Sequence, residues 1–247
     1  MYPPPRFLLE NPLMERWVST LYRDWARLFR PRWGVERRFG RDLLIDQTCP
    51  VGRNMLSRGM AEFRQIERFE AEIRARATSR PAIFLDVGAF WGLYALYFEQ
   101  TGLFDQIHCF EPSPRNRAHL RCHLTMNGLS DRIQTHAIAA SDQTGTAWFQ
   151  EGGGGSQIAE DGSVEVPLRP LDTLFDFRDM FLAIKLDTEG HERQALTGMR
   201  RLLAQNTILL QVEIWEENRS DMLPFLGELG LTQIGAYRDE FWFVGDP

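Results

Sequence analysis

From Ala82 to the end of the chain, short apolar segments alternate with amphipathic ones, and this alternation constrains the fold more than any other feature. It is typical of a mostly parallel sheet covered by helices on both faces. The apolar runs predict strands at residues 82–87, 106–110, 132–139, 181–186 and 207–214. The segments between them predict helices at residues 92–101, 114–127, 191–205 and 218–229. We therefore expect a doubly wound α/β domain.

The end of the chain departs from this alternation. The apolar runs LTQIGAY and FWFVG are separated only by the polar residues RDE. So short a connection cannot hold a helical crossover, and the two strands must pair antiparallel. Residues 143–168, which include four consecutive glycines, are expected to form an irregular hairpin excursion. The sequence therefore predicts a mostly parallel sheet with a C-terminal antiparallel hairpin.

The N-terminal part differs from the rest in charge. Residues 1–41 hold nine arginines against four acidic residues, whereas the whole chain has a formal net charge of -6. Between residues 11 and 29 the apolar positions recur at helical spacing, and residues 59–77 form a second helical stretch. We expect a helical N-terminal extension over residues 1–78 and a main domain over residues 79–247.

Composition limits which binding partners and which cellular compartment we expect for the protein. An acidic main body is a poor match for a nucleic-acid backbone, since phosphate contacts dominate such binding. The basic, Trp-bearing N-terminal helix is compatible with peripheral membrane contact or a lipid substrate, but we favour packing on its own domain or on a second copy in a homo-oligomer. The three cysteines contain no CxxC pair, and there is no membrane span or signal peptide, which predicts a cytoplasmic protein with reduced thiols.

The segment FLDVGAFWG marks the expected cofactor loop. An apolar strand ends at Asp86, the chain turns through Gly88, and a helix begins at about Gly92. Open α/β sheets bind ligands at this edge. A dinucleotide needs a GxGxxG loop against its pyrophosphate, whereas here bulky Phe90 and Trp91 lie between the glycines. S-adenosylmethionine has no pyrophosphate and needs one close approach of the backbone, so we predict this cofactor, with a nicotinamide cofactor as the alternative.

Two later acids extend this prediction. Glu111 ends the second strand, where an acidic side chain accepts hydrogen bonds from both ribose hydroxyls, and Pro112 directs the following turn. Asp142 follows the third strand and could accept from the adenine amino group. Its alternative role is an Asx turn that opens the loop.

The fourth strand ends in a cluster of titratable residues. The segment FLAIKLDTEGHERQAL places Lys185, Asp187, Glu189, His191 and Glu192 around one strand-to-helix turn. Such clusters beside a cofactor are candidate acid/base sites. Transfer of a methyl group to oxygen needs removal of the hydroxyl proton, for which Asp187, Glu189 or His191 could serve, with the ordinary pKa of His191 closest to the one required. A divalent cation held by the same groups is the alternative, but we predict a site without metal.

Structural roles compete with these catalytic ones. Glu189 and Glu192 could stabilise the N-terminus of the following helix. Lys185 is the only lysine in the chain, against 27 arginines, and could pair with Asp187 or with Glu213 at the end of the fifth strand. The other histidines lie singly in strand or helix patterns and are expected to be structural.

Six ordered segments together resemble the FkbM family of methyltransferases. They are FLDVGAFWGLYAL, CFEPSPRNRAHLRCHLTMNGL, AIAASDQTGTAWF, VPLRPLDTLF, FLAIKLDTEGHERQAL and LLQVEIW, over about residues 80–215. The resemblance implies a seven-stranded class I (Rossmann-like) methyltransferase fold, S-adenosylmethionine as methyl donor, and O-methylation of sugar hydroxyls on glycolipids, polysaccharides or related natural products. The family usually has DVGANIG, so Phe90 and Trp91 replace an Asn and an Ile.

The resemblance also assigns residues. It implies cofactor contacts by Asp86, Gly88, Glu111 and Asp142, and we predict that Ala89, Gly92 and Pro112 also contact the cofactor. It implies that the block from Asp187 to Glu192 faces the substrate, and we predict catalytic roles for Lys185, Asp187, Glu189 and His191. Our hypothesis is an O-methyltransferase acting on a glycan, a glycolipid or a small molecule. The alternatives are a nicotinamide-dependent oxidoreductase and a non-catalytic S-adenosylmethionine-binding module.

Overall fold

The computed structural model describes residues 32–49, 51–52, 61–76, 81–151 and 157–247. The fold divides into two compact units, residues 1–68 and 69–247, whereas the sequence placed the boundary after residue 78. Helix α3 (Ala61–Arg76) contains residues of both units and corresponds to the second predicted helical stretch. The helix predicted at residues 11–29 lies outside the described residues.

The first unit contains a hairpin that the sequence did not predict. Strands β1 (Trp33–Arg38) and β2 (Arg41–Asp46) pair antiparallel. Phe39 and Gly40 connect them with φ of 35° and 80°, the positive values that two-residue hairpin turns use. The expectation of a purely helical extension is therefore wrong for this segment. The turn lacks the Asn-Gly or Asp-Gly pair that commonly marks a two-residue hairpin, so the hairpin was not predicted.

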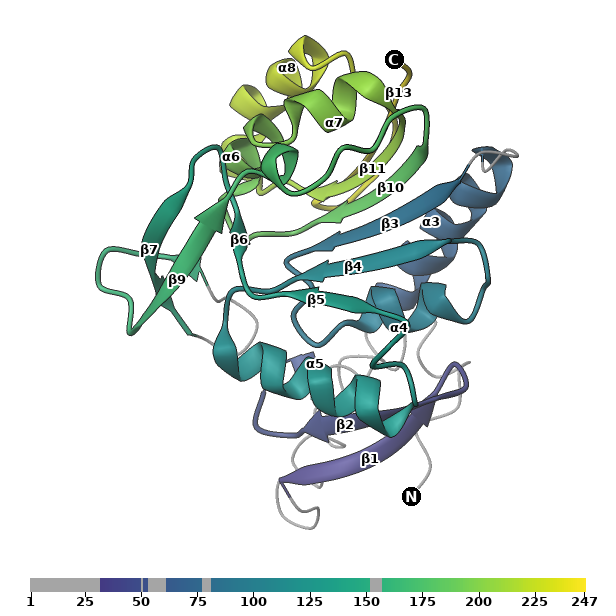
Figure 1. The fold of residues 1–247 in the computed structure, drawn as a ribbon, viewed down its shortest axis with the longest axis vertical. Helices are drawn as coiled ribbons and strands as arrows, with labels where there is room; N and C mark the ends of the chain where they lie inside the picture. The colour runs from purple at the N-terminus through teal and green to yellow at the C-terminus, as the bar shows by residue number, and fades with distance from the viewer. Residues whose placement is uncertain (1–31, 50, 53–60, 77–80, 152–156) are drawn as a thin grey trace, which may run out of the picture. The chain divides into compact units, whose positions relative to one another are not determined.

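The second unit is built on a seven-stranded sheet, drawn at the centre of Figure 1. In spatial order its strands are β12 (Thr232–Tyr237), β13 (Glu240–Gly245), β11 (Thr207–Glu213), β10 (Phe181–Leu186), β3 (Ala82–Val87), β4 (Gln106–Phe110) and β5 (Gln134–His136). Strands β11, β10, β3, β4 and β5 are parallel, and β13 runs antiparallel to β11 and to β12. The predicted doubly wound sheet with its terminal hairpin is confirmed.

The helices follow the predicted order with one interruption. They are α4 (Leu93–Glu99), α5 (Pro114–Met126), α6 (Glu192–Thr197), α7 (Arg200–Gln205) and α8 (Arg219–Glu228), with short 3₁₀ turns at Leu171–Thr173 and Glu216–Asn218. The single helix predicted at 191–205 is wrong, because the chain breaks at Gly198 and Met199 between α6 and α7. Among the described residues, no helix has the length and apolar character that a membrane span requires.

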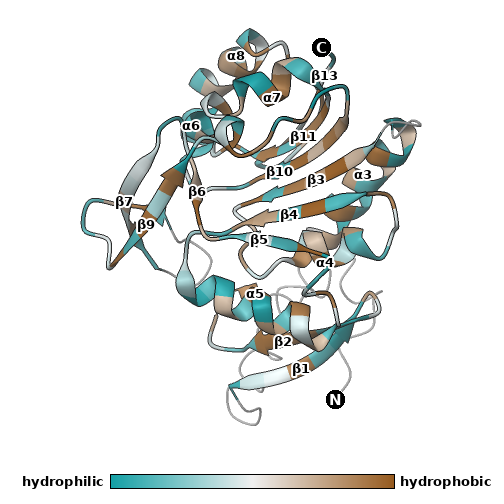
Figure 2. Cartoon of the chain, viewed as in Figure 1, coloured by the Kyte–Doolittle hydropathy of each residue, from teal (hydrophilic) through white to brown (hydrophobic). Residues whose placement is uncertain are grey.

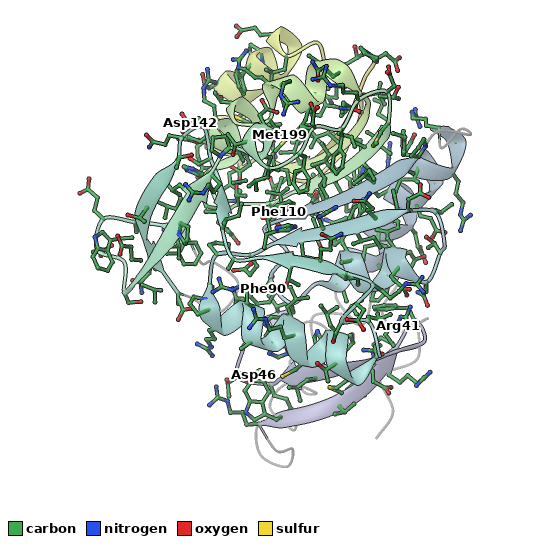
Figure 3. The ribbon with its side chains drawn as sticks, in the orientation of Figure 1. Arg41, Asp46, Phe90, Phe110, Asp142 and Met199 are labelled. Carbon is green, nitrogen blue, oxygen red and sulfur yellow. The ribbon has the colours of Figure 1, made fainter. Side chains whose placement is uncertain are left out.

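The two faces of the sheet carry different cores. One face is aromatic: the ring of Phe84 on β3 lies 4.9 Å from that of Phe98 on α4 and 6.4 Å from that of Phe69 on α3. The other face is mainly aliphatic and packs against α6, α7 and α8, with Met199 among the buried residues (Figure 3). Figure 2 shows apolar residues concentrated on the central strands. Burial on both faces explains why these strands read as continuous apolar runs.

A second, four-stranded sheet accounts for the predicted excursion. Its strands, in spatial order, are β6 (Ala139–Ala140), β9 (Val164–Arg169), β7 (Gly145–Gln150) and β8 (Gln157–Ile158). Strands β7 and β9 form the expected antiparallel hairpin. The strand predicted at 132–139 is split, since β5 belongs to the large sheet and β6 to the small one. The excursion thus begins directly where the third parallel strand ends.

Gly198, between α6 and α7, is closely packed, and this packing can be tested. A Cβ atom on Gly198 would lie 1.8 Å from the carbonyl oxygen of Ser141. We expect Gly198→Ala to lower the free energy of unfolding in urea by about 1–3 kcal/mol, as overpacking does. Gly227→Ala on α8 is the control, because its Cβ would meet nothing within 4 Å. Equal stability of the two variants would contradict this account.

Candidate functional site

The predicted site residues lie where the parallel strands end. Asp86 on β3 is in register with Lys185 on β10, which is in register with Gln211 on β11. Neighbouring residues in register point to the same face of a sheet, so these three side chains share the face that α4 covers. Figure 3 shows Phe110 and Asp142 on the carboxyl-end side of the strands. The structure therefore brings together the two halves of the predicted site.

The first and fourth strand-end turns are in direct contact. Gly88 has φ of 81°, and a Cβ on it would lie 1.7 Å from the carbonyl oxygen of Asp187. The N–H groups of Gly88 and Ala89 both donate to the carbonyl oxygen of Phe110, at 2.9 and 3.0 Å. Glycine is thus needed at position 88 by the packing of three strand ends. Gly92 has a similar role, since its Cβ would lie 2.2 Å from Cδ1 of Leu120 on α5.

Asp86 is a buried acid beneath the start of α4. Its Oδ2 accepts a hydrogen bond from the N–H of Ala95 at 3.3 Å. Burial raises the pKa of Asp86 to about 7, and the nearby ammonium of Lys185 only partly opposes this. The side chain therefore stabilises the cofactor loop's helix and is also a buried group that titrates near neutrality.

Glu111 ties the cofactor loop to the start of α5. Its Oε2 accepts from the N–H of Phe90 at 2.9 Å, and its Oε1 accepts from the N–H of Ser113 at 2.9 Å and from Asn116 Nδ2 at 3.3 Å. Burial raises its pKa to about 7. A carboxylate oxygen has about two acceptor positions, so Oε2 retains one beyond its bond to Phe90. The neighbouring Pro112 is also buried, and its carbonyl oxygen accepts from Arg117.

Phe90 and Trp91 form part of an aromatic stack. The rings of Phe90 and Trp91 stack 4.7 Å apart, and Trp91 stacks on His119 of α5 at 4.0 Å. His123 Nδ1 lies 2.9 Å from the carbonyl oxygen of Trp91. Phe90 has φ of 50°, a strained conformation for a side chain of this size. The stack and the bond to Glu111 hold the loop in this conformation.

Lys185 is a buried cation between two acids. Its Nζ lies 3.2 Å from Asp187 Oδ2, 3.4 Å from Glu240 Oε1 and 5.6 Å from the centre of the Tyr94 ring. Burial lowers its pKa, but the carboxylates of Asp187 and Glu240 outweigh this and hold the pKa well above the ordinary value. Lys185 therefore stays charged and cannot serve as a base. The sequence predicted the partner Asp187 but missed Glu240, which arrives on the antiparallel strand β13.

The two glutamates of the fourth-strand turn have different roles. Glu192 Oε1 accepts from the N–H and the hydroxyl of Thr188, both at 2.9 Å, and from the N–H of Gly190 at 3.1 Å. Its role is the structural one that the sequence left open. Glu189 is half-buried with φ of 55°, and its carboxylate has no hydrogen bond or ion pair with a described residue. Burial and the Asp187 carboxylate raise its pKa to about 7.

His191 connects this turn to the loop after β6. Its Nε2 lies 3.1 Å from Ser141 Oγ, and Ser141 Oγ donates to Asp142 Oδ1 at 3.2 Å. Because the hydroxyl proton points to Asp142, His191 Nε2 carries the hydrogen that faces Ser141. Burial lowers the pKa of His191, with Asp142 opposing, so the imidazole is neutral near pH 7. Asp142 itself is exposed.

His108 and His136, which were predicted to be structural, contact each other and a neighbouring aromatic ring. His108 Nδ1 lies 3.1 Å from His136 Nε2, and the His136 ring stacks on Phe110 at 4.6 Å. Within the described ranges, no group of three or more His, Cys, Asp or Glu side chains is arranged to hold a metal ion. The described cysteines are all free thiols.

Comparison with known proteins identifies the family. The chain matches the methyltransferase FkbM domain over residues 86–231, more than half of its length. The chain belongs to this family. It therefore contains a methyltransferase domain, and the oxidoreductase alternative is set aside. The matched region begins at Asp86 and includes every candidate residue of the site.

Solved structures of methyltransferases are similar to the chain. Methyltransferase FkbM from Methylobacillus flagellatus KT is 22% identical with a TM-score of 0.48, over 67% of this chain and 43% of that one. A human methyltransferase 10 domain containing protein is 12% identical with a TM-score of 0.49, over 95% and 97%. The chain thus spans less than half of the Methylobacillus protein. No curated protein matches it.

The buried acid Asp86 predicts a pH dependence of stability. Its pKa is about 7 in the folded chain, so the folded state holds a proton that the unfolded state has lost. Stability must then fall as pH rises through this window. We expect Asp86→Asn to gain up to about 4 kcal/mol in unfolding free energy, relative to wild type, between about pH 4 and 8. The free energy of unfolding in urea is measured against pH for Asp86→Asn and for the exposed control Asp161→Asn. Parallel pH curves for the two variants would contradict this prediction.

Proposed function

We propose that this methyltransferase moves a methyl group from S-adenosylmethionine to a hydroxyl oxygen of a sugar, a glycolipid or a related natural product, in the cytoplasm. Membership of the FkbM family supports methyl transfer. The half-buried carboxylate of Glu189, which has no described partner and a pKa near neutrality, is the observation that carries the choice of an acceptor with a removable proton.

The chemistry of the strand-end acids fits the cofactor. Asp86 and Glu111 are buried, and burial holds the pKa of each near 7. Lys185, the nearby ammonium group, is already paired with Asp187 and Glu240. A ligand with its own positive charges therefore suits this edge of the sheet. The residues that would hold it are Asp86, Gly88, Ala89, Gly92, Glu111, Pro112 and Asp142.

The chain's own contribution to the reaction is proton removal and orientation. S-adenosylmethionine, when bound, supplies an electrophilic methyl group on a sulfonium. Glu189 accepts the proton of the acceptor hydroxyl, since a base with a pKa close to the working pH is most effective. Asp187 is held by Lys185, and His191 by Ser141, so both position the turn that carries Glu189. Lys185 partly neutralises the carboxylates of Asp187 and Glu240.

Cofactor binding can be tested without knowing the acceptor. We expect S-adenosylhomocysteine to bind the wild-type chain in a calorimetric titration. Glu111→Gln should weaken this binding about tenfold or more, because it loses a charged hydrogen-bond acceptor. Glu228→Gln, which removes an exposed carboxyl group on α8, is the control and should bind as wild type. The proposed cofactor is wrong if the wild type does not bind, or if Glu111→Gln binds equally well.

The role of Glu189 requires a methylation measurement. Glycans and glycolipids from cells with and without the gene are compared by mass spectrometry for products heavier by one CH₂ unit. We expect complementation by Glu189→Gln to restore about 10²–10⁴-fold less of this product than wild type, as loss of a general base does. The same variant should bind S-adenosylhomocysteine normally. Undiminished methylation by Glu189→Gln would remove its assignment as the base.

A further inference from the structure

The two carboxylate oxygens of Asp187 have different surroundings. Its Oδ2 is held by Lys185 at 3.2 Å. Its Oδ1 is buried, and no N–H or O–H group of the described residues donates to it when the neighbouring carboxyl groups are ionised. Glu213 ends β11, whose residues Gln211 and Val212 pair in register with Lys185 and Leu186, so Glu213 lies beside Asp187 at the ends of neighbouring strands and interacts with it. Two ionised carboxylates repel each other, whereas a proton on Glu213 would supply the donor that Asp187 Oδ1 lacks.

The surrounding charges determine where that proton is held. The groups facing Glu213 are Lys185 on β10, Asp187 just after that strand and Glu240 on β13, with Tyr94 of α4 beside the lysine. Glu240 is bound by Lys185 and, at 2.8 Å, by Gln211 Nε2. Of the three acids, Glu213 has the least compensation by positive charge. Burial, followed by the Asp187 carboxylate, raises the pKa of Glu213 to about 8.

We propose that Glu213 is a positioning residue that donates a shared carboxyl proton to Asp187 Oδ1 and thereby fixes the fourth-strand turn that carries Glu189. Asp187 is then held at both oxygens, by Lys185 and by Glu213. The shared proton also limits the negative charge that faces Glu189. Its loss makes Asp187 and Glu213 repel each other. The consequence for turnover rests on the proposed function of Glu189, whereas the carboxyl pair itself does not.

The proton can be detected without cofactor or acceptor. Infrared spectra of the full chain are recorded as the pH is raised through about 8, the range in which Glu213 should ionise. Asp86, Glu111 and Glu189 also absorb as protonated carboxyl groups and ionise near pH 7, so the spectra of the variants are subtracted from that of wild type. We expect one component that persists above pH 7 and disappears around pH 8 in wild type and in the control Glu228→Gln, and that is missing from Glu213→Gln. If Glu213→Gln keeps the same absorption as wild type, the shared proton does not exist.

A second measurement separates positioning from simple structural support. The pH dependence of methylation is compared for wild type, Glu213→Ala and Glu213→Gln. We expect Glu213→Ala to lower kcat about tenfold, the loss of one buried hydrogen bond. Glu213→Gln keeps an N–H donor for Asp187, so it should recover most of kcat and lack the alkaline decline of wild type. An unchanged alkaline decline in Glu213→Gln would overturn the positioning role.

The infrared and the methylation measurements test separate claims. A wild-type chain that methylates nothing contradicts the proposed function, while the infrared result still decides whether Asp187 and Glu213 share a proton. Thermal unfolding of each variant checks that it is folded. S-adenosylhomocysteine affinity should differ less than about threefold among the variants, because Glu213 acts on the turn and not on the cofactor.

Discussion

The contact between the first and fourth strand-end turns is the constraint on which the site depends. Gly88 approaches the carbonyl group of Asp187 so closely that no side chain fits between them. The amide of Asp187 donates in return to the carbonyl oxygen of Val87 at 3.0 Å. One turn belongs to the cofactor loop and the other carries Glu189, so a single backbone contact sets the distance between the proposed donor and base. Core packing on both faces of β3 and β10 keeps it rigid.

Charge is distributed unevenly around this contact. Lys185 is the only lysine in the chain and pairs with Asp187 and Glu240, while Asp86, Glu189 and Glu213 have raised pKa values because they are buried or face other carboxylates. One cation cannot neutralise so many acids, and protons fill the remainder. A ligand that brings positive charge to this edge would replace some of those protons, so cofactor binding and proton release should be linked.

Much of this arrangement could be predicted from the sequence because it depends on local periodicity. The strands at 82–87, 106–110 and 181–186 were predicted with their observed bounds, since buried parallel strands are continuous apolar runs. What failed depends on contacts between distant segments. Gly198, where the predicted helix breaks, packs against the backbone of Ser141, and the partner Glu240 requires an antiparallel strand in register with Glu213. The hairpin at 33–46 lacks the usual turn residues. Sequence spacing could not reveal any of these.

The aromatic contacts of the cofactor loop explain how Phe90 holds a positive φ where the sequence of the resembled family usually has Asn. Asn tolerates a positive φ better than other side chains, whereas Phe90 adopts one at a cost of roughly 1–3 kcal/mol. Here that cost is offset by the Phe90–Trp91–His119 stack and by the bond from Phe90 N–H to Glu111. Glu111 therefore acts on the cofactor loop through the backbone as well as through its free acceptor position. Because Phe90 and Glu111 are joined by this hydrogen bond, the effects of substituting them on cofactor affinity should not be additive.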